Sequence, residues 1–152
     1  MGESHAGNSK EKELLRSAGM KVTPLRLQIL GELIDAARPL SHAELTALMP
    51  DLDRVTLYRS LTTFVEKDIA HQVQGIDGLW RFCAHADDGH GCPGNHPHFL
   101  CTVCGTMTCL TDQRLPRVDV PNECCVDGKQ LVAYGVCSQC SKEAPRGRES
   151  IA

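Results

Sequence analysis

The sequence has few aromatic residues and no long apolar run. Aromatic side chains make up 4% of the chain, so the core has to be built mainly from Leu, Val, Ile and Ala. No apolar stretch reaches the length of about 18 residues that marks a membrane-spanning helix. No charged-then-apolar signal sequence opens the chain either. We therefore expect a soluble, cytoplasmic protein with no membrane partner.

An excess of basic charge is also missing, since the net charge is −3. A globally basic nucleic-acid binder is therefore not indicated. A DNA footprint, however, needs only a basic face. The segment from Leu14 to Gly31 carries Arg16, Lys21 and Arg26 and no acidic residue. The charge pattern thus permits DNA binding without arguing for it.

Cysteine, in contrast, is abundant, with nine residues in a chain of 152. In a reducing compartment this number points to metal or redox chemistry rather than to disulfides. Two CxxC pairs, Cys101/Cys104 and Cys137/Cys140, have the spacing of a tetrahedral Zn(Cys)4 site. A chain of this length forms one medium or two small domains. A small domain has a thin core, so a structural zinc would help to hold it together.

The sequence pattern of the first half of the chain predicts helices followed by a β-hairpin. A short helix covers Lys10–Ala18, and three more begin at Thr23-Pro24, at Ser41 with a capping box to Glu44, and at Asp51 or Asp53. Strands over 69–74 and 79–83 flank a glycine-containing turn. Three helices and a hairpin are the order of a winged helix-turn-helix, with one additional N-terminal helix. The last helix would then be the recognition helix; the alternative is a plain helical bundle with a solvated polar face.

The second half opens with a polar connector, 84–97, which contains His85, His90, Cys92 and His96. It is either a plain linker or, because these side chains lie beside a CxxC pair, part of a metal site. Strands are predicted over 99–101, 107–110 and 131–136. The stretch 111–128 is irregular or holds a short helix, and the chain after Cys140 is expected to be disordered.

Four segments together resemble the ferric uptake regulator superfamily of metal-dependent bacterial repressors. They are Gly19-Met20-Lys21-Val22-Thr23-Pro24-Leu25-Arg26, Val55-Thr56-Leu57-Tyr58-Arg59-Ser60-Leu61, His96-Pro97-His98-Phe99-Leu100-Cys101-x-x-Cys104-Gly105 and Tyr134-Gly135-Val136-Cys137-x-x-Cys140. Their order and spacing match over roughly 12–141. The H-x-H-x-x-C-x-x-C-G segment combined with the terminal CxxC is specific, whereas any one segment alone is weak.

The resemblance implies an α+β protein with a winged-helix DNA-binding domain (1–83), a hinge (84–96) and a small α/β dimerisation domain stapled by Zn(Cys)4, with its tail (97–152). It implies a homodimer that binds a palindromic operator in double-stranded DNA, not an enzyme, and no small-molecule substrate. The DNA contacts expected from it are Lys21, Arg26, Arg54, Thr56, Tyr58 and Arg59.

The resemblance also implies a regulatory metal site at the hinge, carried by His71, Cys83, His96 and His98. Iron sensors typically have Glu where this chain has Cys83. Thiolate and imidazole in a tetrahedral site favour zinc, whereas Fe²⁺ and Mn²⁺ suit octahedral N/O sites. We therefore expect two zinc ions per chain, as in the zinc uptake regulator branch; an iron or manganese sensor is the alternative. His96 and His98 alternate along a strand and should face opposite sides, and Cys109 should be a packing residue.

Two alternative functions belong to other classes of protein, a zinc-dependent deaminase and a thiol redox sensor. His42-Ala43-Glu44 followed by a CxxC pair partly matches the H-x-E…P-C-x-x-C signature of zinc-dependent deaminases. However, Leu100 rather than Pro precedes Cys101, and the second CxxC pair would have no role in such an enzyme. A thiol redox sensor with only structural zinc could use Cys83, Cys109 or the Cys124-Cys125 pair. His85, His90 and Cys92 could form an accessory metal site or lie in a mobile loop, and Cys124 and Cys125 are by default spare surface thiols.

Overall fold

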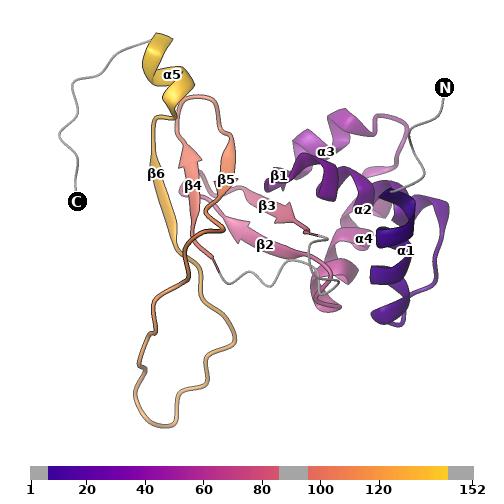
Figure 1. Cartoon of the computed structure of the whole chain (residues 1–152), viewed down its shortest axis with the longest axis horizontal. Coiled ribbons are helices and arrows are strands. Elements are labelled where there is room, and N and C mark those ends of the chain that lie inside the picture. The colour runs from indigo at the N-terminus through magenta and orange to yellow at the C-terminus, as the bar shows by residue number, and fades with distance from the viewer. Residues whose placement is uncertain (1–6, 86–95, 144–152) are drawn as a thin grey trace.

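The computed structural model describes residues 7–85 and 96–143, which form helices and two small three-stranded sheets (Figure 1). The helices are α1 (Gly7–Ser17), α2 (Pro24–Ala36), α3 (His42–Leu48), α4 (Arg54–Glu66) and α5 (Ser138–Glu143). The strands are β1 (Leu40–Ser41), β2 (His71–Gln74), β3 (Trp80–Cys83), β4 (His98–Cys101), β5 (Met107–Cys109) and β6 (Val132–Gly135). None of the described helices has the length and apolar character needed to cross a membrane.

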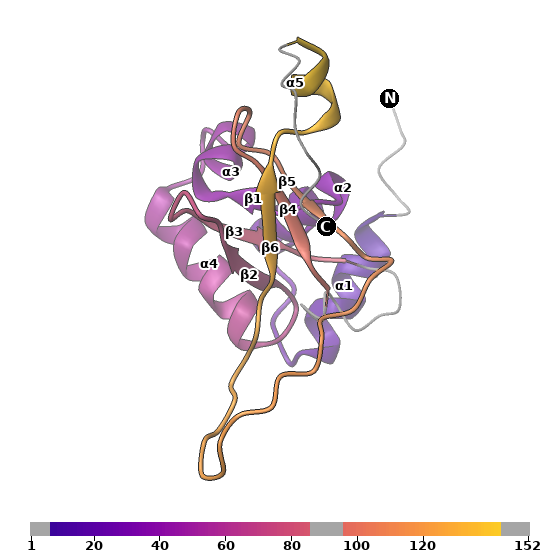
Figure 2. The ribbon, with the colours of Figure 1, turned by 90° about the vertical axis from the view of Figure 1, so that its left-hand side faces the viewer.

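The two sheets divide the molecule into a helical part and a smaller second part. Helices α1 to α4 gather around the first sheet, whose strand order is β1-β3-β2 (Figure 1). The second sheet has the order β5-β4-β6, with β4 antiparallel to β5 and parallel to β6. Seen from its own side, the second sheet lies in front of the β2–β3 hairpin (Figure 2). The predicted winged helix followed by a small α/β unit is therefore confirmed.

The starts of α2 and α3 follow from local hydrogen bonds that the sequence predicts. The Thr23 hydroxyl oxygen accepts a hydrogen bond from the Arg26 backbone N–H at 3.3 Å, and Pro24 occupies the first turn, where no N–H is needed. Ser41 and Glu44 form the full capping box, with bonds of 3.2 and 2.8 Å. These caps fix where the helices of the first unit begin.

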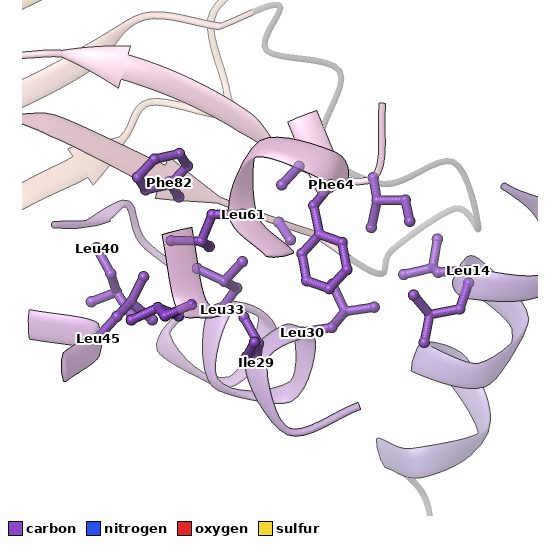
Figure 3. Close-up of a cluster of buried hydrophobic side chains, with 14 of the residues drawn as sticks. Leu14, Ile29, Leu30, Leu33, Leu40, Leu45, Leu61, Phe64 and Phe82 are labelled. Atoms are coloured by element: carbon purple, nitrogen blue, oxygen red, sulfur yellow. The ribbon is translucent and has the colours of Figure 1, made fainter. Parts of the chain in front are cut away.

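The main core lies between the helices and the first sheet. Leu30 of α2 and Leu61 and Phe64 of α4 have no exposed surface. Figure 3 shows the Phe64 ring reaching toward Leu30, with Leu14 of α1 on the far side of the cluster. Burying a side chain of this size contributes about 1.5–3 kcal/mol. Phe82 of β3 belongs to the same cluster, so this packing joins α4 to the hairpin.

A smaller core joins the hairpin, which is the wing of the winged helix, to the second sheet. Val73 of β2 is packed with Leu100 of β4 and Met107 of β5, and all three are buried. At Gly75, where the wing turns, an added Cβ would come within 2.8 Å of Leu100 Cδ2. Any larger residue there would have to displace the buried Leu100 side chain. The wing and the second sheet are therefore in direct contact.

Two expectations about the second half are revised. The helix α5 extends to Glu143, so the chain is ordered for three residues past Cys140, where disorder was expected; residues 144–152 lie outside the described part. Residues 110–131 contain neither helix nor strand, so of the two alternatives for 111–128 the irregular one is correct. The division into 1–83, 84–96 and 97–152 stays a prediction.

Candidate metal centres and DNA-facing helix

The two CxxC pairs meet at one end of the second sheet. Cys101 ends β4, Cys137 follows β6, and Cys140 lies in α5. The parallel register of β4 and β6 places Cys101 opposite Gly135, which brings the two CxxC turns together. The four sulfur atoms of Cys101, Cys104, Cys137 and Cys140 lie within 4.8 Å of one another.

Hydrogen bonds and pKa values at this four-cysteine cluster suit a bound cation. The Cys101 sulfur accepts hydrogen bonds from the backbone N–H groups of Cys104 at 3.5 Å and Cys137 at 3.3 Å. These bonds lower the pKa of the Cys101 thiol to about 6. The hydrogen bond to Cys137, together with burial and the nearby Cys104 and Cys101, raises the pKa of Cys140 to about 12. Four ionised sulfurs at this range repel one another unless a cation is present, and four thiolates fit structural zinc.

Three histidines converge at the junction of the wing and the second sheet. His71 lies in β2, His98 begins β4, and His96 is in the bend before it. Their donor nitrogens lie within 4.8 Å of one another, and the Nε2 atoms of His71 and His98 are 3.2 Å apart. His96 Nε2 and His98 Nδ1 are buried and have no hydrogen-bond partner among the described residues. Buried imidazole nitrogens without such a partner fit metal ligands.

A second group of donors lies beside the three histidines. The Cys83 sulfur is 3.3 Å from His85 Nε2 and 3.5 Å from the Cys109 sulfur. Hydrogen bonds from Cys83, and then from His85, His98 and His96, lower the pKa of the Cys109 thiol to about 2. Cys109 therefore offers a thiolate that faces both donor groups.

The structure brings the four predicted hinge ligands into one region but not into one group. His71, His96 and His98 converge, whereas Cys83 groups with His85 and Cys109. The expectation that His96 and His98 face opposite sides is wrong, because their ring centroids are 4.7 Å apart. The strand begins only at His98, so strand alternation does not apply to His96.

Sequence reasoning missed Cys109 as a member of this region and left His85 open between a metal site and a plain linker. Cys109 was expected to pack, yet β5 pairs it with His98 and so aims it at the hinge. The pairing of β4 with β5 could have indicated this. His90 and Cys92 lie outside the described residues, and Cys124 and Cys125 are exposed, as surface thiols would be.

The predicted DNA contacts lie on two elements of the first unit. Asp53, not Asp51, caps α4: its Oδ2 accepts hydrogen bonds of 2.9 Å from both the N–H and the hydroxyl of Thr56. On the same helix Arg54, Tyr58 and Arg59 are exposed. This leaves the two arginines and the tyrosine able to reach a ligand, while the Thr56 hydroxyl already serves the cap.

The other two predicted contacts stand at the start of α2. Lys21 is exposed, and the Arg26 guanidinium donates a hydrogen bond of 2.8 Å to the Lys21 carbonyl. This bond holds Arg26 against the turn that precedes the helix.

Comparisons with known proteins agree with this architecture. The model of the ferric uptake regulator family matches residues 17–125. The peroxide operon regulator of Bacillus subtilis (strain 168) is 28% identical over 142 residues, covering 86% of this chain and 91% of that protein. The ferric uptake regulation protein of Bordetella parapertussis is 29% identical over 137 residues, covering 84% and 94%.

A solved structure of a zinc uptake regulator complexed with zinc and DNA has the same fold, with a TM-score of 0.58 and 17% identity over 90% of this chain and 93% of that one. Members of the matched family are DNA-binding, metal-binding transcriptional regulators rather than enzymes. Since the family model covers most of the chain, from the end of α1 to the irregular segment before β6, the protein belongs to the ferric uptake regulator family.

Proposed function

We propose that the protein is a zinc-responsive repressor that binds a palindromic DNA operator as a homodimer when its hinge is loaded with zinc. One observation carries this proposal: the donors gathered at the hinge are imidazoles and thiols. Neither hinge group contains a carboxylate among the described residues. Zinc accepts such soft and borderline donors in tetrahedral sites, whereas Fe²⁺ and Mn²⁺ favour sites with more oxygen.

The proposed regulatory ligands include the four expected from sequence, His71, Cys83, His96 and His98, and we add Cys109. Each unit of the molecule contributes to them. His71 and Cys83 stand opposite each other on the wing strands β2 and β3, while His98 and Cys109 stand opposite each other on β4 and β5. A zinc ion bound here would hold the wing against the second sheet.

Holding the wing matters because it is continuous with the DNA-facing helix. Ala70, at the start of the wing, donates a backbone hydrogen bond to the Phe64 carbonyl of α4 at 3.2 Å. The position of α4 thus follows that of the wing. A dimer binds two half-sites only when its two recognition helices have the spacing of the DNA grooves. A loose hinge would add an entropic cost to that arrangement.

The proposal also covers the second zinc site, the DNA contacts and the cellular compartment. Cys101, Cys104, Cys137 and Cys140 hold a second, structural zinc that keeps the second unit folded for dimerisation. Arg54, Tyr58 and Arg59 contact the DNA from α4, Thr56 supports them through the Asp53 cap, and Lys21 and Arg26 assist from the start of α2. The protein acts in the cytoplasm, where the cysteines stay reduced.

Operator binding tests the proposal. Duplexes would be selected from a random library with the zinc-loaded protein, and binding would be measured by gel shift with zinc, iron or manganese. We expect zinc alone to support binding. Cys83→Ser should lose zinc-dependent binding while the dimer stays folded, and Cys124→Ser, an exposed cysteine, should behave as wild type. Normal zinc-dependent binding by Cys83→Ser would refute the proposal.

A thiol redox sensor is the second candidate, favoured by the 3.5 Å approach of the Cys83 and Cys109 sulfurs. Such a sensor would lose DNA binding with peroxide and would not need zinc at the hinge. Counting metal separates the two functions. Zinc at the hinge in addition to the structural ion supports the zinc sensor, and structural zinc alone supports the redox sensor.

A further inference from the structure

The hinge has more metal donors than one ion can use. Six side chains, His71, His85, His96, His98, Cys83 and Cys109, each offer a nitrogen or sulfur atom there. A tetrahedral zinc takes four ligands at most. At least two of these donors are therefore left over if the hinge holds a single ion.

The six donors are also sorted by position. His71, His96 and His98 have their donor atoms within 4.8 Å of one another, and so do Cys83, His85 and Cys109. The strand registers explain the sorting, because His71 is opposite Cys83 and His98 is opposite Cys109. Each pair of neighbouring strands thus supplies one donor to each group.

This arrangement makes each group a link between the two units. The histidine group takes His71 from the wing and His96 and His98 from the second unit. The thiol group takes Cys83 and His85 from the wing side and Cys109 from β5. The two groups lie next to each other, since the ring centroids of His85 in the thiol group and His96 in the histidine group are 5.8 Å apart.

We propose that the hinge binds two zinc ions, one held by His71, His96 and His98 and the other by Cys83, His85 and Cys109. With the four-cysteine cluster, each chain then carries three ions instead of two. The proposal deepens the zinc-sensing function above and rests on it for the identity of the metal.

Donor chemistry makes the two hinge ions distinguishable. The thiol group would give its ion two sulfur ligands, and the histidine group would give its ion nitrogen ligands only. Each group provides three protein donors, which leaves a fourth position for water or for a shared donor. Cys109 is placed to be shared, because its thiol interacts with His96 and His98 as well as with Cys83.

Cobalt substitution tests this directly. Protein retaining its structural zinc would be stripped of hinge metal with a mild chelator and titrated with Co²⁺. Sulfur-to-cobalt charge transfer reports thiolate ligation, and the visible bands report total binding. We expect wild type to take up two equivalents, only one of them with strong charge transfer. Saturation at a single equivalent would overturn the proposal, and so would the absence of binding.

Variants then assign the ions. The double variant Cys83→Ser/Cys109→Ser should keep one equivalent and lose the charge-transfer band. His71→Ala should keep one equivalent with that band, and His85→Ala should weaken only the thiolate-ligated ion. Loss of all binding in both His71→Ala and the double variant would indicate one mixed site instead. Cys124→Ser is the matched control, and circular dichroism checks that each variant is folded.

The outcome separates this inference from the proposed function. Two hinge equivalents without zinc-dependent DNA binding would leave the second site standing and refute the sensor. One hinge equivalent with intact zinc-dependent DNA binding would refute the second hinge site and leave the zinc sensor standing.

Discussion

The Arg81 guanidinium donates a hydrogen bond of 3.1 Å to the carbonyl of Gly105, joining the wing to the turn that follows Cys104. Arg81 is 2% exposed, although it is charged. Its other partners are Asp77, which accepts bonds of 3.0 and 2.7 Å, and the Leu79 carbonyl, which accepts one of 3.4 Å. The wing is therefore joined to the loop that carries part of the structural cysteine cluster.

Replacing this arginine should loosen the contact between wing and second sheet. Arg81→Met keeps the buried stem but removes the charged donors, so the carbonyls of Gly105 and Leu79 and the Asp77 carboxylate all lose the guanidinium, although Asp77 keeps its bond from the Leu79 N–H. Because hydrogen bonds to charged groups contribute about 1.5–3 kcal/mol each and Asp77 is partly exposed, we expect a loss of about 2 kcal/mol in the free energy of unfolding. Urea unfolding of the zinc-loaded protein measures this loss.

Arg117→Met provides the matched control. Arg117 also pairs with an aspartate, Asp119, at 2.9 Å, but their side chains are 89% and 81% exposed. An exposed pair contributes little, so this variant should unfold as wild type does. Equal free energies of unfolding for the two variants would show that the Arg81 contact does not contribute to stability.

The sequence predicts the parts of this molecule that depend on near neighbours in the chain. The Thr23-Pro24 helix start and the Ser41 capping box each involve residues within four positions, and both were predicted correctly. The spacing of the two CxxC motifs likewise predicted that their four cysteines form one cluster. These features need no knowledge of how distant segments meet.

The hinge was predicted less completely because it depends on strand register. Cys109 becomes a hinge residue only through its pairing with His98, eleven positions earlier in the chain. The strand start at His98, and hence the convergence of His96 with it, follows from tertiary packing rather than from alternation. His85 could not be told from the other polar residues of its connector.

Zinc binding at the four-cysteine cluster should strengthen as pH rises. The pKa of the Cys101 thiol is about 6, so this sulfur is ionised at neutral pH. The pKa of Cys140 is about 12, so without metal its thiol keeps its proton. Zinc requires the thiolate and must displace this proton. Between these two pKa values, each proton released makes the affinity rise about tenfold per pH unit.

Chelator competition over about two pH units above neutrality measures this dependence. The Cys83→Ser/Cys109→Ser background keeps the hinge thiols from contributing. An affinity that does not change with pH would mean that all four thiols ionise before the metal arrives.

Arg59 should contribute to DNA affinity through a phosphate. It is exposed on α4, six residues after the Asp53 cap. Removing one phosphate contact weakens binding similarly on all sequences and reduces the slope of log affinity against log salt by about 1. Arg59→Ala, measured by fluorescence anisotropy at several salt concentrations, should show this smaller slope. Arg117→Ala, on the irregular segment, should keep the wild-type slope. If both slopes equal the wild-type value, Arg59 does not contact a phosphate.

Peroxide should join Cys83 to Cys109 when the hinge lacks metal. Their sulfurs are 3.5 Å apart, well beyond the S–S bond of about 2.05 Å, so a small movement suffices. The Cys109 thiolate attacks one peroxide oxygen and becomes a sulfenic acid, releasing hydroxide that is protonated to water. The Cys83 thiol then displaces a second water from that sulfur. Two thiols are oxidised, and one peroxide is reduced to two waters.

Mass spectrometry can locate this disulfide. No Lys or Arg lies between Phe82 and Arg114, so trypsin leaves both cysteines in one peptide. Chymotrypsin, which cuts after Phe99 and Leu100, separates them unless they are cross-linked. We expect the cross-link in protein stripped of hinge metal, and none in zinc-loaded protein, where both sulfurs are ligands. Cys109→Ser should abolish it and Cys124→Ser should not. Equal cross-linking with and without zinc would mean that these sulfurs do not bind the metal, and would favour the redox sensor over the zinc sensor.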